Sequence, residues 1–138
     1  MATKKAETRI RKVVCIEDDE DMFKLIALIL RSKGFEVLDA RSGPDGLALI
    51  QRVKPDVVLL DIMLPEMNGW DVYKLMKDDE YMRTIPVIVV TAKAQAIDET
   101  LARYIAKVDD FIPKPFTPSD LEESVNKVLG IATKALEQ

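Results

Sequence analysis

The sequence predicts a doubly wound α/β domain built on a five-stranded parallel sheet. Two observations support this prediction. Short apolar runs alternate five times with segments of helical periodicity. One of the runs, residues 57–60, is apolar at every position, which is typical of a strand buried on both faces of a parallel sheet. We therefore expect right-handed crossovers that place helices on both faces of the sheet.

Composition restricts the class of protein. A chain of 138 residues with 48% hydrophobic content is long enough for one domain whose core needs no disulfide. The net charge of -4 argues against direct binding to nucleic acid. The chain has one cysteine, Cys15, no histidine, and no apolar run that suits a membrane span or signal peptide. We therefore expect a cytoplasmic protein without membrane contact, in which any metal is a hard, oxygen-binding cation.

The first half of the chain supplies two strands and two helices. Residues 1–11 are polar and are expected to form a flexible tail. An apolar run at 12–16 predicts the first strand, and the acidic run 17–21 leads into a helix that ends at Gly34. A second short strand covers 36–40. Gly43-Pro44 then opens a helix that must stop before Pro55.

The second half repeats the pattern three times. The strand at 57–60 precedes a helix that begins near Gly69, with Val72, Leu75 and Met76 on one side. A strand at 87–91 leads to helical periodicity over 97–105, marked by Ile97, Leu101, Tyr104 and Ile105. The last strand covers 110–113. The last helix starts at Thr117-Pro118 and buries Leu121, Val125, Val128 and Leu129.

The domain is expected to span residues 12–130, with 131–138 forming a tail or a helix extension. Ala132 and Leu136 prolong the apolar stripe past Gly130, which favours the extension. The nine residues after Leu129 are too few for an effector domain. The chain is therefore expected to be either a stand-alone domain or one part of a longer protein.

Four strands end in residues that can do chemistry: Glu17-Asp18, Asp61, Thr91 and Lys114. In the 2-1-3-4-5 strand order of a flavodoxin-like (βα)5 fold, these carboxyl ends are neighbours. Three adjacent carboxylates repel one another and favour protonation unless a cation neutralises them. Mg²⁺ does so with oxygen ligands and leaves room for a phosphate oxygen. The sequence thus predicts a Mg²⁺ site that handles phosphoryl groups.

Three residues of this group have an expected role in handling a phosphoryl group. Asp61 is the central acid and can attack phosphorus to form an aspartyl phosphate. Lys114 supplies a mobile ammonium for phosphoryl oxygens, and Thr91 supplies a hydroxyl donor. Asp61 alone could instead cap the next helix, but Asn68 or Gly69 is better placed for that purpose.

The combined pattern resembles the receiver domain of two-component response regulators over about residues 12–130. The matching features are the acids after the first strand, Asp61 with Pro65 and Gly69 in its loop, Thr91-Ala92, and Phe111-Ile112-Pro113-Lys114-Pro115-Phe116. The resemblance implies that Asp61 takes a phosphoryl group from a phosphohistidine. It also implies a cis Lys114-Pro115 peptide, and Mg²⁺ held by Glu17, Asp18, Asp61 and the Met63 carbonyl.

The resemblance further implies a phosphorylation-activated signalling switch rather than a conventional enzyme. Thr91 and Phe111 would be the switch residues, acting on the surface formed by the 97–105 helix, the last strand and the last helix. The expected partners are a sensor histidine kinase or phosphotransfer protein, and a downstream effector protein or domain. A phosphorylation-dependent homodimer is a further expectation.

The chain departs from the family at several positions. Lys107-Val108 stand where receivers commonly have Gly-Ala, and Phe111 has no hydroxyl to donate. Met63 and Lys93 are expected to border the phosphorylated carboxylate. Because neither can accept a hydrogen bond from a hydrolytic water as a carboxylate or amide would, we expect slow autodephosphorylation.

Four other classes of protein could share parts of this pattern. A haloacid-dehalogenase-like phosphatase would place a second Asp where Met63 stands, and a P-loop enzyme would need G-x-x-x-x-G-K-[ST], which is absent. A flavodoxin would need a phosphate loop after the first strand, where this chain has five acids. The serious alternative is a phosphate-independent interaction module, or pseudo-receiver, of the same fold.

Overall fold

The computed structural model describes residues 9–92 and 107–131. These residues form five strands, four α-helices and one short 3₁₀ helix. In chain order they are β1 (Lys12–Ile16), α2 (Glu20–Arg31), β2 (Glu36–Ala40), α3 (Gly43–Val53), β3 (Val57–Leu60), α4 (Gly69–Asp78), η1 (Met82–Thr84), β4 (Val87–Thr91), β5 (Asp110–Pro113) and α6 (Pro118–Leu129).

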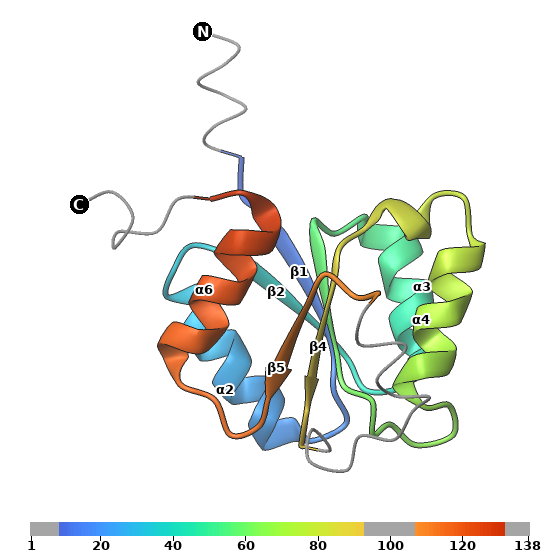
Figure 1. Ribbon diagram of the computed structural model, residues 1–138, viewed down its shortest axis with the longest axis horizontal. Coiled ribbons are helices and arrows are strands. Elements are labelled where there is room, and N and C mark those ends of the chain that lie inside the picture. Colours follow the sequence, from blue (N-terminus) through green and yellow to red (C-terminus); the bar gives the residue numbers. More distant parts are fainter. Residues whose placement is uncertain (1–8, 93–106, 132–138) are drawn as a thin grey trace, which may run out of the picture.

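The five strands form one parallel sheet in the order β2-β1-β3-β4-β5 (Figure 1). Residues Val13 and Val57 are partners between β1 and β3, while Val89 and Phe111 are partners between β4 and β5. The predicted fold class and strand order are therefore confirmed. The order reverses between β1 and β3, and an open α/β sheet binds ligands at such a point.

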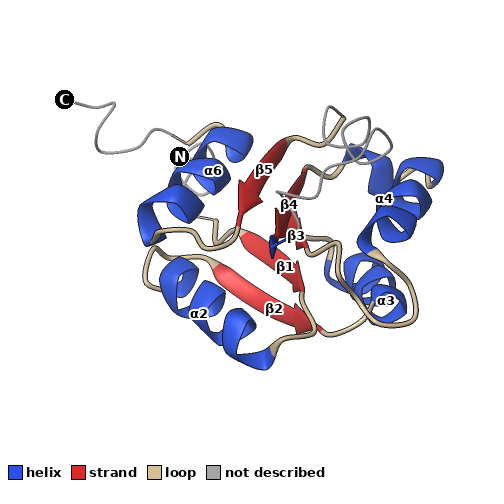
Figure 2. Ribbon diagram, turned by 60° about the horizontal axis from the view of Figure 1, so that its bottom comes forward, coloured by secondary structure: helices blue, strands red, loops and turns tan. Residues whose placement is uncertain are grey.

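Helices cover both faces of the sheet (Figure 2). One core lies between the sheet and helices α2 and α6, and it includes Cys15, Leu30 and Leu121. The other lies between the sheet and helices α3 and α4, and it includes Ile16, Ile50 and Met76. All four residues of β3 are buried, as expected for a strand covered on both faces.

Side chains at the helix ends explain where the helices begin and stop. The N-caps are Asp19, Ser42, Asn68 and Thr117, each of which accepts a hydrogen bond from a backbone N–H in the first turn. Asn68 rather than Asp61 caps α4, so capping does not explain the Asp61 carboxylate. Gly130 follows α6 with φ 72°, and this left-handed residue ends the helix.

The structure refines several local expectations. Helix α6 ends at Leu129 and Ile131 is not helical, so the tail, one of the two expected alternatives, fits the described residues, which end at Ile131. On α4 the side chain of Leu75 is 45% exposed, whereas Tyr73 is 4% exposed and takes the buried position. The 3₁₀ helix η1 was not predicted from the sequence. The helix expected over 97–105, Lys93, Ala132 and Leu136 lie outside the described residues.

The expected tail is tied to the domain at its last residues. The Arg9 guanidinium donates two hydrogen bonds, of 3.2 and 2.8 Å, to the Asp56 carboxylate. The Asp56 carboxylate also accepts a 2.7 Å bond from the Lys12 backbone N–H. Arg11 donates to the Leu129 carbonyl at the end of α6. Residues 9–11 of the expected flexible tail therefore contact the domain, while residues 1–8 lie outside the described part of the chain. No helix in the described parts of the chain is long and apolar enough to cross a membrane.

Candidate functional site

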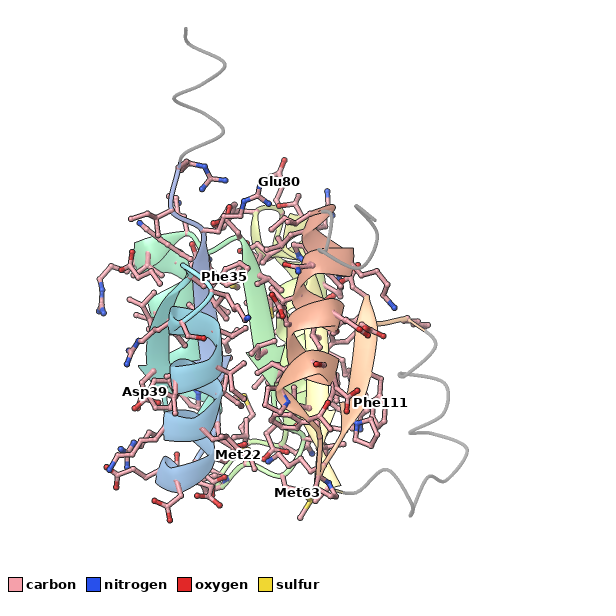
Figure 3. All side chains as sticks on the ribbon, turned by 90° about the vertical axis from the view of Figure 1, so that its left-hand side faces the viewer. Met22, Phe35, Asp39, Met63, Glu80 and Phe111 are labelled. Atoms are coloured by element: carbon pink, nitrogen blue, oxygen red, sulfur yellow. The ribbon has the colours of Figure 1, made fainter. Side chains whose placement is uncertain are left out.

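The candidate site lies at the carboxyl edge of the sheet, toward which the β4 arrow points in Figure 1. Glu17 follows β1 directly and Asp61 follows β3 directly, while Thr91 is the last residue of β4. Lys114 follows β5. Because the strands are parallel, four separate segments of the chain deliver these side chains to one place. Met63, labelled in Figure 3, lies at this same edge.

Three carboxylates gather at this edge: Glu17, Asp18 and Asp61 each offer an oxygen, and these oxygens all lie within 4.8 Å of one another. Glu17 is 2% exposed and Asp61 is 6% exposed, whereas Asp18 is open to solvent. Buried carboxylates this close are unfavourable without a neutralising charge. A cation at this sheet edge would relieve the repulsion among these carboxylates.

Lys114 supplies a positive charge inside this cluster. Its ammonium lies 2.6 Å from Glu17 Oε1 and 3.2 Å from Asp61 Oδ2. The Lys114 backbone N–H donates to the Thr91 carbonyl over 2.9 Å, and the Lys114-Pro115 peptide bond is cis. Burial lowers the pKa of Lys114, but the hydrogen bond to Glu17 and the Asp61 charge outweigh it and raise the pKa overall. Lys114 therefore stays charged.

The pKa of Glu17 reflects the burial and the crowding of negative charge in this cluster. Burial is the largest influence and raises the pKa of Glu17 to about 7. The negative charge of Asp61 raises this pKa further, and the hydrogen bond from Lys114 opposes the rise. The Glu17 carboxylate also accepts a hydrogen bond from the Asp19 N–H. A titrating carboxyl at a ligand-binding sheet edge is a common mark of function.

The loop after β3 fixes the Asp61 carboxylate. The Asp61 backbone N–H donates to the Ile16 carbonyl, and Asp61 Oδ1 accepts from the Met63 N–H over 3.0 Å. Gly69 brings the start of α4 back beneath this turn, because its N–H donates to the Ile62 carbonyl. A Cβ at Gly69 would lie 2.7 Å from Ile62 Cα and closer still to the Asp61 carbonyl oxygen. Only glycine allows this approach without a shift of the backbone.

The two expected switch residues lie on neighbouring strands. Thr91 is fully buried at the end of β4. Phe111 lies on the edge strand β5, is half-buried, and is not part of either apolar core of the described residues (Figure 3). It lines a hollow of about 380 Å³ between β5 and α6. A Ser124–Asp110 hydrogen bond of 2.5 Å joins the same two elements.

The structure thus brings together the side chains expected at the carboxyl edge, namely Glu17, Asp18, Asp61 and Lys114. The Met63 backbone N–H donates a hydrogen bond to the Asp61 carboxylate. The role of the Met63 carbonyl as a metal ligand stays a prediction. Lys114 lies closer to Glu17 than to Asp61, which the sequence pattern did not predict. The close approach at Gly69 was not predicted either; Asn68-Gly69 at the helix start was its only signal in the sequence.

The donor set suits a hard divalent cation. Among the described residues it offers carboxylate oxygens and the adjacent Lys114 ammonium, and carboxylate oxygens are the ligands that Mg²⁺ prefers. The same arrangement places the Asp61 carboxylate beside the Lys114 ammonium, and attack of a carboxylate on a phosphoryl group would need a positive charge of this kind.

Comparison with protein families identifies the same region. The family model for the response regulator receiver domain matches residues 13–126. The chain is 38% identical over 122 residues to the polar-differentiation response regulator DivK of Brucella ovis, covering 88% of this chain and 98% of DivK. It is 33% identical over 115 residues to the DNA-binding response regulator MtrA of Mycobacterium tuberculosis, covering 83% of this chain and 49% of MtrA. The chain therefore spans about half the length of MtrA.

Solved structures show the same architecture. A CheY-like response regulator receiver domain protein from Methanospirillum hungatei superposes with a TM-score of 0.78 at 27% identity, covering 88% of this chain and 95% of that one. The receiver domain of the sensor histidine kinase PA1611 from Pseudomonas aeruginosa has a TM-score of 0.80 at 25% identity, covering 88% and 99% of the two chains. That domain was solved with a magnesium ion coordinated in its active site cleft.

Proposed function

Because this chain belongs to the response regulator receiver domain family, we propose that it is a signalling switch that is activated by phosphorylation of Asp61. The observation that carries the proposal is the convergence of Glu17, Asp18 and Asp61 around the Lys114 ammonium. The phosphodonor would be a phosphohistidine on a sensor histidine kinase or phosphotransfer protein. The response would then pass to a downstream effector protein or domain.

The reaction is a transfer of one phosphoryl group between two nucleophiles. An Asp61 carboxylate oxygen attacks phosphorus, an O–P bond forms, and the P–N bond to the donor imidazole breaks with its electron pair left on nitrogen. Asp61 Oδ1 is held by the Met63 amide and Oδ2 is near Lys114, so the carboxylate is oriented before the donor arrives. Lys114, together with the Thr91 hydroxyl, would stabilise the charge on the transferred group.

Glu17, Asp18, Asp61 and the Met63 carbonyl are the proposed ligands of Mg²⁺. When bound, Mg²⁺ neutralises the carboxylates and the phosphoryl oxygens that approach them. The bound Mg²⁺ of the PA1611 receiver domain supports this assignment. The protein residues orient the nucleophile and hold the counter-charge, as the contacts of Asp61 and Lys114 indicate.

The proposed output is a change of packing that starts at Thr91 and ends at Phe111. The two residues lie on paired strands, and Thr91 is the register partner of Pro113, two residues beyond Phe111. A Thr91 side chain drawn toward the phosphoryl group would leave space that Phe111 can enter. The hollow between β5 and α6 gives Phe111 room to change its position. Such a two-state element would alter the surface of β5 and α6 on which an effector or a second copy could dock.

We further propose that the phosphorylated state is long-lived for its class. The Met63 side chain is 50% exposed at the site edge, where an apolar thioether cannot orient a hydrolytic water. Lys93, the second residue of this prediction, lies outside the described residues.

A cytoplasmic location is proposed on the same basis as the kinase partner, since both follow from the proposed signalling role.

Intact-mass spectrometry after incubation with a small acyl phosphate and Mg²⁺ tests the proposal. We expect one phosphate adduct on the wild-type chain and none on Asp61→Asn, whose amide is nearly isosteric but cannot act as the carboxylate nucleophile. Asp71→Asn is the control, because Asp71 is an exposed acid in the first turn of α4 and should leave the adduct intact. A stoichiometric adduct on Asp61→Asn would refute the assignment, and no adduct on the wild-type chain would favour a phosphate-independent module.

A further inference from the structure

A second hollow, separate from the carboxylates, lies between α4 and the segment that leads into β5. Its lining residues are Tyr73, Lys74, Lys77, Asp78 and Lys107, and its volume is about 400 Å³. None of these residues belongs to the Glu17–Asp18–Asp61 cluster. A volume of this size falls within the range of about 300–1,000 Å³ that is usual for small-molecule sites. We call this hollow the Tyr73 pocket.

The described lining of the Tyr73 pocket is positively charged, although the protein is not. Three lysines against one aspartate give these described residues a charge of +2, while the whole chain carries -4. Within the described parts of the chain, no salt bridge joins Lys74, Lys77 or Lys107 to a carboxylate. Lys74 and Lys107 are exposed, so their ammonium groups are available to a ligand. A local concentration of positive charge of this kind attracts anions.

The buried ring of Tyr73 organises the pocket. Tyr73 is 4% exposed, and its hydroxyl donates a 3.0 Å hydrogen bond to the Lys107 carbonyl. This bond fixes the backbone of Lys107 against α4, although the two residues are 34 positions apart. The Lys77 ammonium lies 5.2 Å from the Tyr73 ring centroid and donates to the Arg83 carbonyl over 3.3 Å. The Lys77 ammonium and the backbone of Lys107 are therefore positioned before any ligand arrives, which lowers the entropic cost of binding.

We propose that the Tyr73 pocket binds a small molecule that carries two or more linked phosphate groups, as a nucleoside diphosphate does. Lysine ammonium groups bind phosphate oxygens as compact point charges, and each has three donors. A net charge of +2 suits a ligand with several negative charges better than one with a single charge. The pocket is concave and of small-molecule size, which suits such a ligand better than an extended polymer.

This proposal is independent of the function proposed for Asp61. Without a cation, the clustered carboxylates repel anions, so a polyphosphate should prefer the Tyr73 pocket in metal-free buffer. The test is a titration of ¹⁵N-labelled protein followed by NMR, with tripolyphosphate, ADP and sulfate as separate probes. Metal is removed from the buffers with a chelating resin, because a soluble chelator such as EDTA is itself a polyanion.

We expect tripolyphosphate and ADP to shift the amide signals of Tyr73, Lys74, Lys77 and Lys107. Sulfate should bind much more weakly. Lys74→Gln combined with Lys107→Gln should weaken tripolyphosphate binding about tenfold, because two charged contacts are lost. Both side chains are exposed, so the variant should stay folded. The control is Lys24→Gln with Lys33→Gln, which removes the same charge from α2 and the turn after it. It should change the affinity less than about twofold.

Three results would overturn the proposal. The first is a set of shifts centred on Asp61 and Lys114 instead of Tyr73. The second is equal weakening in the double variant and its charge-matched control, which would mean that only the overall charge matters. The third is sulfate binding as tightly as tripolyphosphate, which would mean that linked phosphates are not recognised.

Discussion

Mg²⁺ should stabilise the fold through Glu17 and Asp18, and the geometry sets the scale of the effect. The oxygens of Glu17 and Asp61 lie within 4.8 Å of each other. At an effective dielectric constant of about 20, two unit charges at that distance repel by about 3 kcal/mol. Lys114 offsets part of this repulsion at 2.6 and 3.2 Å. The remaining negative charge favours a divalent cation in the folded state only, since the unfolded chain does not bring these acids together.

Binding to the folded state alone raises stability by mass action. At a Mg²⁺ concentration ten times the Kd, the free energy of unfolding should rise by about 1.4 kcal/mol. For a chain of 138 residues the entropy of unfolding is about 0.3 kcal/mol/K, so Tm should rise by roughly 5 °C. Thermal unfolding followed by circular dichroism in metal-free buffer, with MgCl₂ or NaCl at equal ionic strength, measures the shift.

Variants locate the effect within the acidic run. Glu17→Gln with Asp18→Asn should reduce the Mg²⁺ shift to that of NaCl, because two of the three clustered carboxylates are lost. The control is Glu20→Gln with Asp21→Asn, which removes the same charge from exposed acids in the first turn of α2. The control should keep the shift. If Tm rises with Mg²⁺ in the double variant as much as in the wild type, the acids form only a helix-end charge cluster.

Four further predictions test the parts of the site. In metal-free buffer, the raised pKa of Glu17 should contribute stability below about pH 4.5 that is lost as pH rises through about 7; urea unfolding at several pH values should show this loss in the wild type and not in Glu17→Gln. Gly69→Ala should destabilise the fold by about 1–3 kcal/mol, because its Cβ would meet Ile62; an unchanged urea midpoint would contradict the close approach. Asn68→Ala should remove the α4 N-cap at a cost of about 1 kcal/mol, again measured by urea unfolding, without loss of phosphate uptake. Met63→Asn should speed dephosphorylation, followed as decay of the mass adduct; an equal or slower decay would argue against the shielding role.

The sheet could be predicted from sequence because its signals are local. Residues 57–60 are apolar throughout, and Pro55 and Pro86 come shortly before the starts of β3 and β4. The site edge was predictable for a related reason: an acid or a lysine directly after an apolar run can only lie at the carboxyl end of that strand. Topology then makes those ends neighbours, so Asp61 and Lys114 could be grouped without knowledge of any distance.

The misses depend on contacts that no local pattern encodes. On α4, helical spacing allows either Leu75 or Tyr73 to face inward. Tyr73 takes the buried position, where its hydroxyl reaches the Lys107 carbonyl, 34 residues away. Arg9 is likewise held by Asp56 across 47 residues, where the sequence showed only a polar tail. Local composition could predict which residues are polar, but not which distant partner each would meet.

Lys114 follows β5 directly and so connects this strand to the candidate site. Its ammonium lies between Glu17 and Asp61, and its backbone N–H is bonded to the Thr91 carbonyl. A phosphoryl group on Asp61 would bring additional negative charge close to the Lys114 ammonium on its Asp61 side. Bound Mg²⁺ would compete with the Lys114 ammonium for the Glu17 carboxylate. Both changes would shift the balance of contacts at Lys114 in the same direction, away from Glu17. Because the chain runs from Phe111 to Lys114 within four residues, a movement of Lys114 would act directly on β5, the strand that holds the proposed switch residue Phe111. We therefore expect Lys114→Met to weaken the coupling between Asp61 and Phe111. In this variant, the chemical-shift changes on forming a phosphoryl mimic should remain near Asp61 and fail to reach Phe111. Changes that still reach Phe111 in this variant would assign the coupling to Thr91 alone.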